Sequence, residues 1–211
     1  MTTLINQLNS TWEQATEIWL SGGWAMLAIA AVALVMFALG VHMYLKLRGK
    51  GFETVPEKTW RHWALEPAAR QGTIGDLLNF VTGARSLKDI SVSFEELRVT
   101  EIAPFARDLR VMKICVGAAP LLGLLGTVTG MLATFGALAT GSGGEKTMAM
   151  VADGISEALI TTETGLVIAL PGLFFQYQLT RKHESYKAFL AHLETVCTQN
   201  LYKSLRRRRA A

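Results

Sequence analysis

Acidic side chains occur inside a stretch of the chain that is otherwise apolar enough to cross a membrane. Between residues 151 and 180 the sequence carries Asp153, Glu157 and Glu163. An ionised carboxylate in hydrocarbon costs at least ~2.5 kcal/mol, so such residues normally face a bundle interior, water or a partner. Because burial favours the uncharged form of a carboxyl group, these residues are candidates for reversible proton binding within a membrane.

The acidic residues Glu157 and Glu163 lie on different faces of the predicted helix, which indicates different roles. Asp153, Glu157, Thr161 and Thr164 lie on one narrow polar stripe of a helix, whereas Glu163 lies about 120° away from Glu157. We interpret Glu157 as a residue of a proton path and Glu163 as a second acidic site at another interface. Asp153 is expected near the outer water. The alternative is that these carboxyl groups are protonated or hydrogen-bonded and only hold helices together.

A second apolar stretch, residues 114–140, is rich in small residues. Gly126 and Gly130 form a G-x-x-x-G pattern and Gly123 lies one turn earlier. Small residues let membrane helices approach closely, so we expect these glycines to pack against another helix. The sequence also has two prolines within apolar runs, which we assign to the packed part of the helices because neighbours can satisfy the carbonyl groups they free. These prolines are Pro120 and Pro171.

Hydroxyl groups in both stretches extend the predicted polar path. Thr127 and Thr134 are seven residues apart, so they share one face of a helix. Together with Thr161 they can bind water or relay a proton beside Glu157.

Three long apolar runs must position these side chains. Half of the 211 residues are hydrophobic, and they are gathered in runs separated by charged stretches. A run of about 20 apolar residues is long enough to span a bilayer as a helix. We therefore predict an all-α polytopic membrane protein with three transmembrane helices and long helices extending into the cytoplasm. The predicted segments are a periplasmic amphipathic helix over 1–23, spans over 24–45, 114–140 and 151–180, a cytoplasmic helical region over 46–113, a periplasmic loop over 141–150 and a basic cytoplasmic tail over 181–211.

The positive charges predict the orientation of the spans. Residues 46–113 carry twelve Lys and Arg residues and the tail after residue 180 carries eight, whereas the segment before the first span carries none. Positively charged segments that flank membrane helices remain on the cytoplasmic side. The N-terminus is therefore expected in the periplasm and the C-terminus in the cytoplasm.

The remaining composition argues against several other functions. The net charge of +4 comes mainly from residues that flank the apolar runs, so topology explains it better than a nucleic-acid partner. The four His residues show no metal-ligand spacing, and we find no catalytic set, so we expect neither an enzyme nor a bound cofactor. A run of four arginines near the C-terminus either binds anionic phospholipid or is a solvated segment that sets the topology. This run is Arg206, Arg207, Arg208 and Arg209.

Two motifs resemble the MotA/TolQ/ExbB proton channel family, and ExbB-like members in particular. They are APLLGLLGTVTGM over 119–131 and GISEALITTETGLVIALPG over 154–172. The three-span layout, with a basic region between the first two spans, is also similar. The family's lining positions fall on Thr127, Glu157 and Thr162, whereas Glu163 stands where a small residue is common.

The resemblance implies an assembly and a mechanism. It implies a homo-oligomeric ring, typically a pentamer, around the single membrane helices of two ExbD-like or TolR-like subunits, whose membrane Asp is the main proton carrier. Protons would be the coupling ion. A TonB-like energy transducer would carry the work to outer-membrane receptors from a ring in the bacterial inner membrane.

Two alternatives to this function stay open. A TolQ-type subunit that powers cell-envelope constriction has the same layout, and a non-conducting membrane scaffold would need the carboxyl groups only for packing. A MotA-type stator subunit is expected to have four spans, whereas this sequence has three.

Overall fold

The structure is a computed structural model that describes residues 19, 22–83, 86–140 and 144–210, with the side chains of 208–210 left out. The amphipathic helix predicted over 1–23 lies outside the described residues except for its last positions. Part of the loop predicted over 141–150 lies outside them as well. The described residues form helices and turns without strands, which confirms the all-α fold class.

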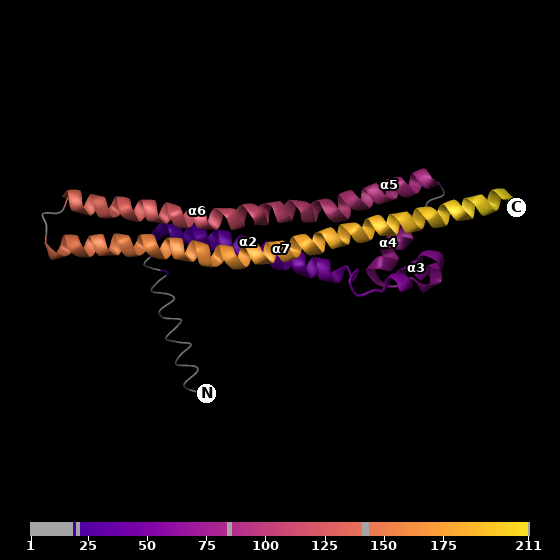
Figure 1. Ribbon diagram of the computed structural model, residues 1–211, viewed down its shortest axis with the longest axis horizontal. Helices are drawn as coiled ribbons and strands as arrows, with labels where there is room; N and C mark the ends of the chain where they lie inside the picture. Colours follow the sequence, from indigo (N-terminus) through magenta and orange to yellow (C-terminus); the bar gives the residue numbers. More distant parts are fainter. Residues whose placement is uncertain (1–18, 20–21, 84–85, 141–143, 211) are drawn as a thin grey trace, which may run out of the picture. The chain divides into compact units, whose positions relative to one another are not determined.

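Helices of very different length make up the fold, and Figure 1 labels them along the chain. The three that reach into the apolar runs are much longer than the others. The elements are α2 (Gly23–Gly49), α3 (Glu57–Leu65), the short helix η1 (Pro67–Ala69), α4 (Gly72–Thr82), α5 (Leu87–Leu97), the π-helical turn η2 (Arg98–Ile102), α6 (Ala103–Thr140) and α7 (Glu145–Ala210).

Three helical stretches are long and apolar enough to cross a membrane, as the sequence predicted. They lie within α2, within the helical run that ends with α6, and within α7. The predicted boundaries differ from the structure at the third span. Helix α7 begins at Glu145, so the second half of the predicted 141–150 loop is helical, and the helix continues through the predicted tail to Ala210.

Pro104 lies at the start of α6, and the helical run that begins with α5 continues past it into the second span. Proline has no N–H group, so Pro104 cannot donate to the carbonyl group four residues earlier. The structure places the π-helical turn η2 directly before α6, and the N–H of Ala103 donates to the carbonyl of Arg98. The helical run therefore passes Pro104 directly after a π-helical turn, a local change in hydrogen bonding that often accompanies an interruption of the regular helix.

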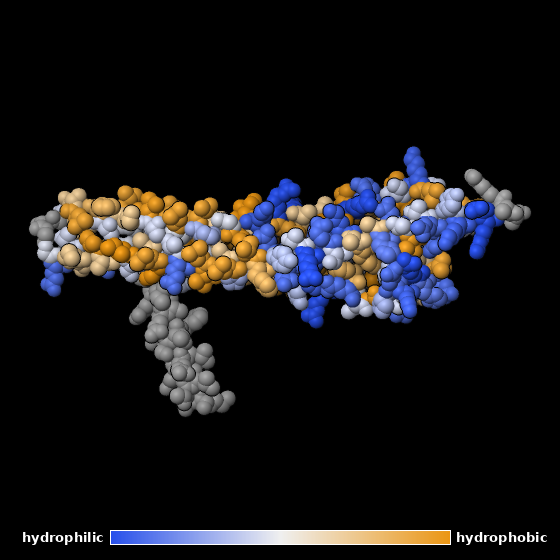
Figure 2. All heavy atoms as spheres, in the orientation of Figure 1, coloured by the Kyte–Doolittle hydropathy of each residue, from blue (hydrophilic) through white to orange (hydrophobic). Residues whose placement is uncertain are grey.

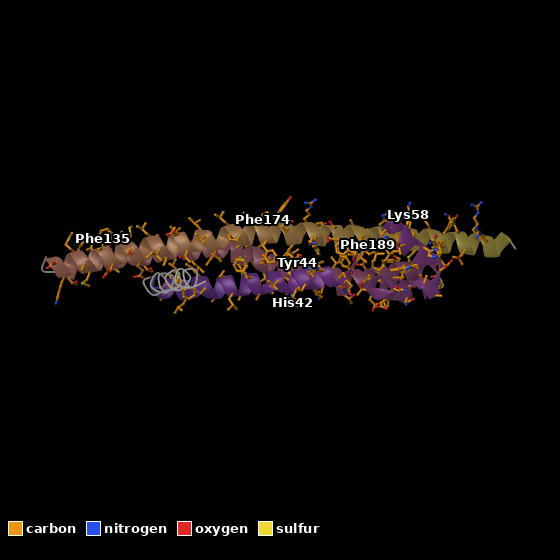
Figure 3. All side chains as sticks on the ribbon, turned by 90° about the horizontal axis from the view of Figure 1, so that it is seen from below. His42, Tyr44, Lys58, Phe135, Phe174 and Phe189 are labelled. Atoms are coloured by element: carbon orange, nitrogen blue, oxygen red, sulfur yellow. The ribbon has the colours of Figure 1, made fainter. Side chains whose placement is uncertain are left out.

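The chain divides into two compact units. The first, which we call the span unit, comprises Met1–Ala38 and Val111–Phe175. Figure 2 shows hydrophobic residues over its parts of α6 and α7. Large apolar side chains such as Phe135 and Phe174, both labelled in Figure 3, are 62% and 65% exposed. Outward-facing apolar residues are what a helix surface in contact with lipid requires.

The second unit, which we call the charged unit, comprises Leu39–Arg110 and Gln176–Ala211. Its core contains large side chains, among them Phe94, Phe105 and Tyr186, each at most 1% exposed. The Phe189 ring, labelled in Figure 3, lies 5.8 Å from the Trp60 ring. Ion pairs lie on its surface. In one of them the Lys182 Nζ atom lies 2.9 Å from the Glu53 Oε2 atom. This unit is therefore built like the interior of a water-soluble domain.

Candidate functional site

Glycines of α6 bring the backbones of α6 and α7 into direct contact. A Cβ atom added to Gly123 would lie 2.8 Å from the carbonyl oxygen of Thr161, and one added to Gly130 would lie 2.6 Å from that of Gly154. A Cβ atom on Gly126 would overlap the hydroxyl group of Thr161. Side chains larger than hydrogen do not fit at these three positions, so small residues determine how closely the helices pack.

Small residues of α7 complete the same contact. A Cβ atom on Gly165 would lie 2.7 Å from the carbonyl oxygen of Ala119, and one on Gly172 would lie 2.5 Å from the sulfur atom of Met36. Because Met36 belongs to α2 and a methyl group of Val116 in α6 lies 3.3 Å from the same Cβ position, all three spans meet at the level of Gly172. Sequence reasoning did not identify the α7 glycines, although small residues recur there every three or four positions, which is the signal of a close helix contact.

Two of the predicted path residues are buried inside this contact. Thr161 is completely buried, and its hydroxyl group donates to carbonyl oxygens of its own helix, 3.1 Å from that of Glu157 and 3.0 Å from that of Ala158. Thr134 is 6% exposed and donates to the Met131 carbonyl at 2.7 Å. Both side chains therefore face the partner helix of the same subunit, and their part in a proton path stays a prediction.

Thr127 and Thr162 are brought together on one side of the helix pair. The hydroxyl group of Thr162 donates to the carbonyl oxygen of Gly123 at 3.0 Å, which links α7 to α6. Thr127 lies one helical turn after Gly123 and donates to the Leu124 carbonyl at 2.6 Å. Both threonines are partly exposed, so their hydroxyl oxygens can accept further hydrogen bonds from that side.

Glu157 lies on a different side of α7. On a helix it is about 140° from Thr162, and its carboxyl group lies against Gly23, the first residue of α2. The side chain is partly exposed. One subunit therefore does not present Glu157 and the pair of Thr127 and Thr162 on a common face.

The other two acidic residues of the predicted third span lie on the exposed surface of α7. Glu163 is exposed, and on the helix it is surrounded by exposed apolar residues such as Leu159, Leu166 and Leu170, which are 65%, 49% and 68% exposed. Asp153 is also exposed. A carboxyl group at the centre of an apolar membrane face needs cover from another helix, so an interface position for Glu163 stays a prediction.

The prolines lie inside the two long helices, and the described C-terminal arginines lie at the end of α7. Pro120 lies inside α6 and Pro171 inside α7, and both helices continue past them. Of the four arginines, Arg206 and Arg207 are exposed at the end of α7. The side chains of Arg208 and Arg209 lie outside the described residues.

Two buried groups of the charged unit, Cys197 and Tyr186, have raised pKa values. Burial raises the pKa of the Cys197 thiol to about 11 and also raises the pKa of the Tyr186 hydroxyl, on which the nearby Glu101 acts in the same direction. Both groups therefore stay protonated at neutral pH. Over the ranges that the structure describes, no cluster of His, Cys, Asp and Glu is arranged to hold a metal ion.

Known proteins with similar sequences include proteins named for biopolymer transport and a protein of the Tol-Pal system. The chain is 46% identical over 71 residues to a Synechocystis protein provisionally named biopolymer transport protein ExbB-like 1, a match that covers 33% of this chain and 28% of that protein. It is 31% identical over 170 residues to an ExbB homologue of Methanothermobacter thermautotrophicus, covering 73% of this chain and 58% of that protein. It is 34% identical over 101 residues to the Tol-Pal system protein TolQ of Pseudomonas aeruginosa, covering 48% of this chain and 40% of that protein.

These matches span less than two thirds of the length of each relative. The model of the MotA/TolQ/ExbB proton channel family matches residues 79–191, slightly more than half of the sequence. The matched region contains the close contact between α6 and α7 together with Thr127, Glu157 and Thr162. Three helices able to span a membrane accompany this match, and the chain belongs to the MotA/TolQ/ExbB proton channel family.

Proposed function

We propose that the chain is a ring-forming subunit of a proton-driven inner-membrane motor that energises TonB-dependent transport across the outer membrane. Protons act as the coupling ion, and an ExbD-like subunit with a single membrane helix lies inside the ring. A TonB-like protein transmits the work. Membership in the family and the similarity to relatives named ExbB support this proposal.

The observation that carries the proposal is the position of Glu157. Its helix is apolar enough to span a membrane, yet the Glu157 carboxyl group is held against α2 rather than pointing away from the protein. A carboxyl group held by protein within a membrane can gain and lose a proton where lipid alone would exclude its charged form. A carboxyl group within a membrane-spanning helix is costly to bury, and we assign it the role of binding protons at this place.

The separation of the polar residues favours several copies around a common path. Glu157 and the pair of Thr127 and Thr162 lie on different sides of the helix pair, so one copy cannot line a path with all three. Copies arranged in a ring can bring the Glu157 side of one subunit towards the threonine side of the next. We propose a pentamer, in line with the expectation from the family.

The available energy is adequate for such a motor. One elementary charge that crosses the membrane releases ~2.3 kcal/mol per 100 mV, and a few kcal/mol suffice to shift a two-state equilibrium strongly. We place the N-terminus in the periplasm and the basic segments in the cytoplasm, following the positive-inside rule. Protons then enter from the side of the N-terminus.

Substitution of Glu157 tests the proposal. Glu157→Ala is expected to abolish energised uptake while the protein still assembles with its ExbD-like partner, measured by uptake of a TonB-dependent substrate and by copurification. Assembly together with normal uptake would contradict the proposed role of Glu157.

A TolQ-type function is the second candidate, because the relative from Pseudomonas aeruginosa is named TolQ. Such a subunit would power constriction of the cell envelope. Purifying the chain from its native membrane with bound partners separates the two candidates, since an ExbD-like and TonB-like set supports uptake and a TolR-like set supports constriction. A non-conducting scaffold would show no proton flux with either set.

The exposed arginines at the end of α7 favour contact with anionic phospholipid. Each positive charge near an anionic surface contributes ~1 kcal/mol, and Arg206 and Arg207 are exposed. Replacing Arg206 to Arg209 by Gln should weaken binding of the purified protein to vesicles with anionic headgroups. Equal binding to vesicles before and after the substitution would contradict this role.

A further inference from the structure

Gly23 begins the first membrane helix in a conformation that few residues adopt. Its φ angle is +61°, in the left-handed region, where a Cβ atom is strained. A Cβ atom at this position would also overlap the carboxyl oxygen Oε1 of Glu157 and lie 2.7 Å from the carboxyl carbon. Glycine is therefore needed at this position for two separate reasons.

The neighbouring glycine provides a contrast. A Cβ atom on Gly22 would meet the terminal methyl group of Met26 at 2.6 Å. That methyl group is the far end of a flexible side chain, which can move to another rotamer at small cost. Gly22 has no positive φ angle, so an alanine is far easier to accommodate there than at Gly23.

The first turn of α2 is an electrostatically favourable place for a carboxylate. The first N–H groups of a helix have no partner within the helix, and the aligned peptide dipoles give this end a partial positive charge. The carboxyl group of Glu157 lies at Gly23, in this first turn. The negative form of Glu157 is attracted to this end of α2, whereas the protonated form is not.

We propose that the first turn of α2 positions the carboxyl group of Glu157, with Gly23 as the positioning residue that leaves room for it. This inference rests on the role of Glu157 in the proposed function and adds the first span to the proton-binding site.

Carbodiimide labelling tests the positioning directly, because these reagents modify protonated carboxyl groups in apolar surroundings. We would label the full-length protein in its native membrane without a proton gradient and quantify modified Glu157 by mass spectrometry, with Glu163 as the internal reference on the same helix. Gly23→Ala should raise the labelling of Glu157 relative to Glu163 by about threefold, a factor that matches the typical dipole energy at a helix end. Gly22→Ala, the matched control, should leave the ratio unchanged.

A second substitution separates the overlap from the backbone strain. Asn tolerates positive φ angles better than other residues with a side chain, so Gly23→Asn keeps the overlap with Glu157 and reduces the strain. It should raise the ratio as Gly23→Ala does. An unchanged ratio in Gly23→Asn, or an equal rise in Gly22→Ala, would overturn the positioning role.

A reciprocal measurement leaves Gly23 intact, in case its variants fail to fold. In Glu157→Gln the negative charge is absent, so amide hydrogen exchange in the first turn of α2 should become about threefold faster. Glu163→Gln should leave this exchange unchanged. Equal exchange in both variants would overturn the proposal. Neither labelling nor exchange depends on transport. Normal uptake in Glu157→Ala would contradict the proposed function, and this outcome is separate from the labelling and exchange results that test the positioning role.

Discussion

The span unit and the charged unit use opposite kinds of side chain to pack helices, although α6 and α7 contribute to both. In the span unit, glycines and threonines lie between the helices, and large residues such as Phe135 point outward. In the charged unit, large residues such as Phe105 lie inside, and ion pairs occupy the surface. Among the described residues every ion pair lies in the charged unit.

The difference follows from the solvent of each unit. Water drives large apolar side chains into a core, whereas lipid is as apolar as those side chains and gives them no reason to leave it. Close van der Waals contact then has to come from small residues that let the backbones approach. One continuous helix can satisfy both rules because its sequence changes along its length.

Removing a phenyl group from each unit should give the largest difference in stability between the two units. Phe105→Ala deletes a side chain that is 1% exposed and should destabilise the protein by about 3 to 5 kcal/mol. Phe135→Ala removes the same group from the same helix where it is 62% exposed. It should cost much less, because lipid fills the space. Unfolding in mixed detergent micelles measures both, and equal costs would contradict the comparison.

Adding one methyl group should have opposite effects on the free energy of unfolding at two glycines of α6. Gly126→Ala should destabilise the protein by about 1 to 3 kcal/mol, because the methyl group overlaps buried Thr161. Gly136 has no neighbouring atom within 4 Å of an added Cβ, so Gly136→Ala should stabilise the helix by up to about 1 kcal/mol. The unfolding free energies of the two variants provide the check. Destabilisation of equal size at both positions would mean that the close contact is not specific to the glycine face.

Hydroxyl groups in the span unit should contribute less than packing. Thr162→Val removes the hydrogen bond to the Gly123 carbonyl and should cost about 0.6 to 1.7 kcal/mol, the range of such bonds between membrane helices. Thr164 donates to the Ile160 carbonyl of its own helix, so Thr164→Val should cost less and serves as the control. Comparison of the two unfolding free energies sharpens the account, and a larger cost for Thr164→Val would contradict it.

The sequence predicts the spans well because they depend only on the length of apolar runs. The span predicted over 151–180 does not by itself give the length of α7, which runs from Glu145 to Ala210. The change from apolar to charged residues at Arg181 suggested the end of a segment, but composition there marks a change of solvent rather than the end of the helix. Residues 181–210 contain neither Gly nor Pro, so nothing in them interrupts helical hydrogen bonding.

The candidate site was only partly predictable. The spacing of Gly126 and Gly130 indicates a close helix contact, but the pattern does not say that Gly126 meets Thr161. Burial of Thr161 between helices depends on how α6 and α7 are rotated about their axes, which packing decides. The contact of Gly23 with Glu157 joins two different spans, and local sequence patterns contain no information about such a pairing.

Proton flux through the assembled complex tests the central claim most directly. Vesicles that contain the chain and the proposed ExbD-like partner would be given an imposed pH gradient and followed with an internal pH-sensitive dye. The wild-type complex and Asp153→Asn, a change in an exposed carboxyl group one turn from Glu157, should both conduct protons. Glu157→Ala should reduce the flux to that of empty vesicles. Flux through the Glu157→Ala complex at the wild-type rate would contradict the account.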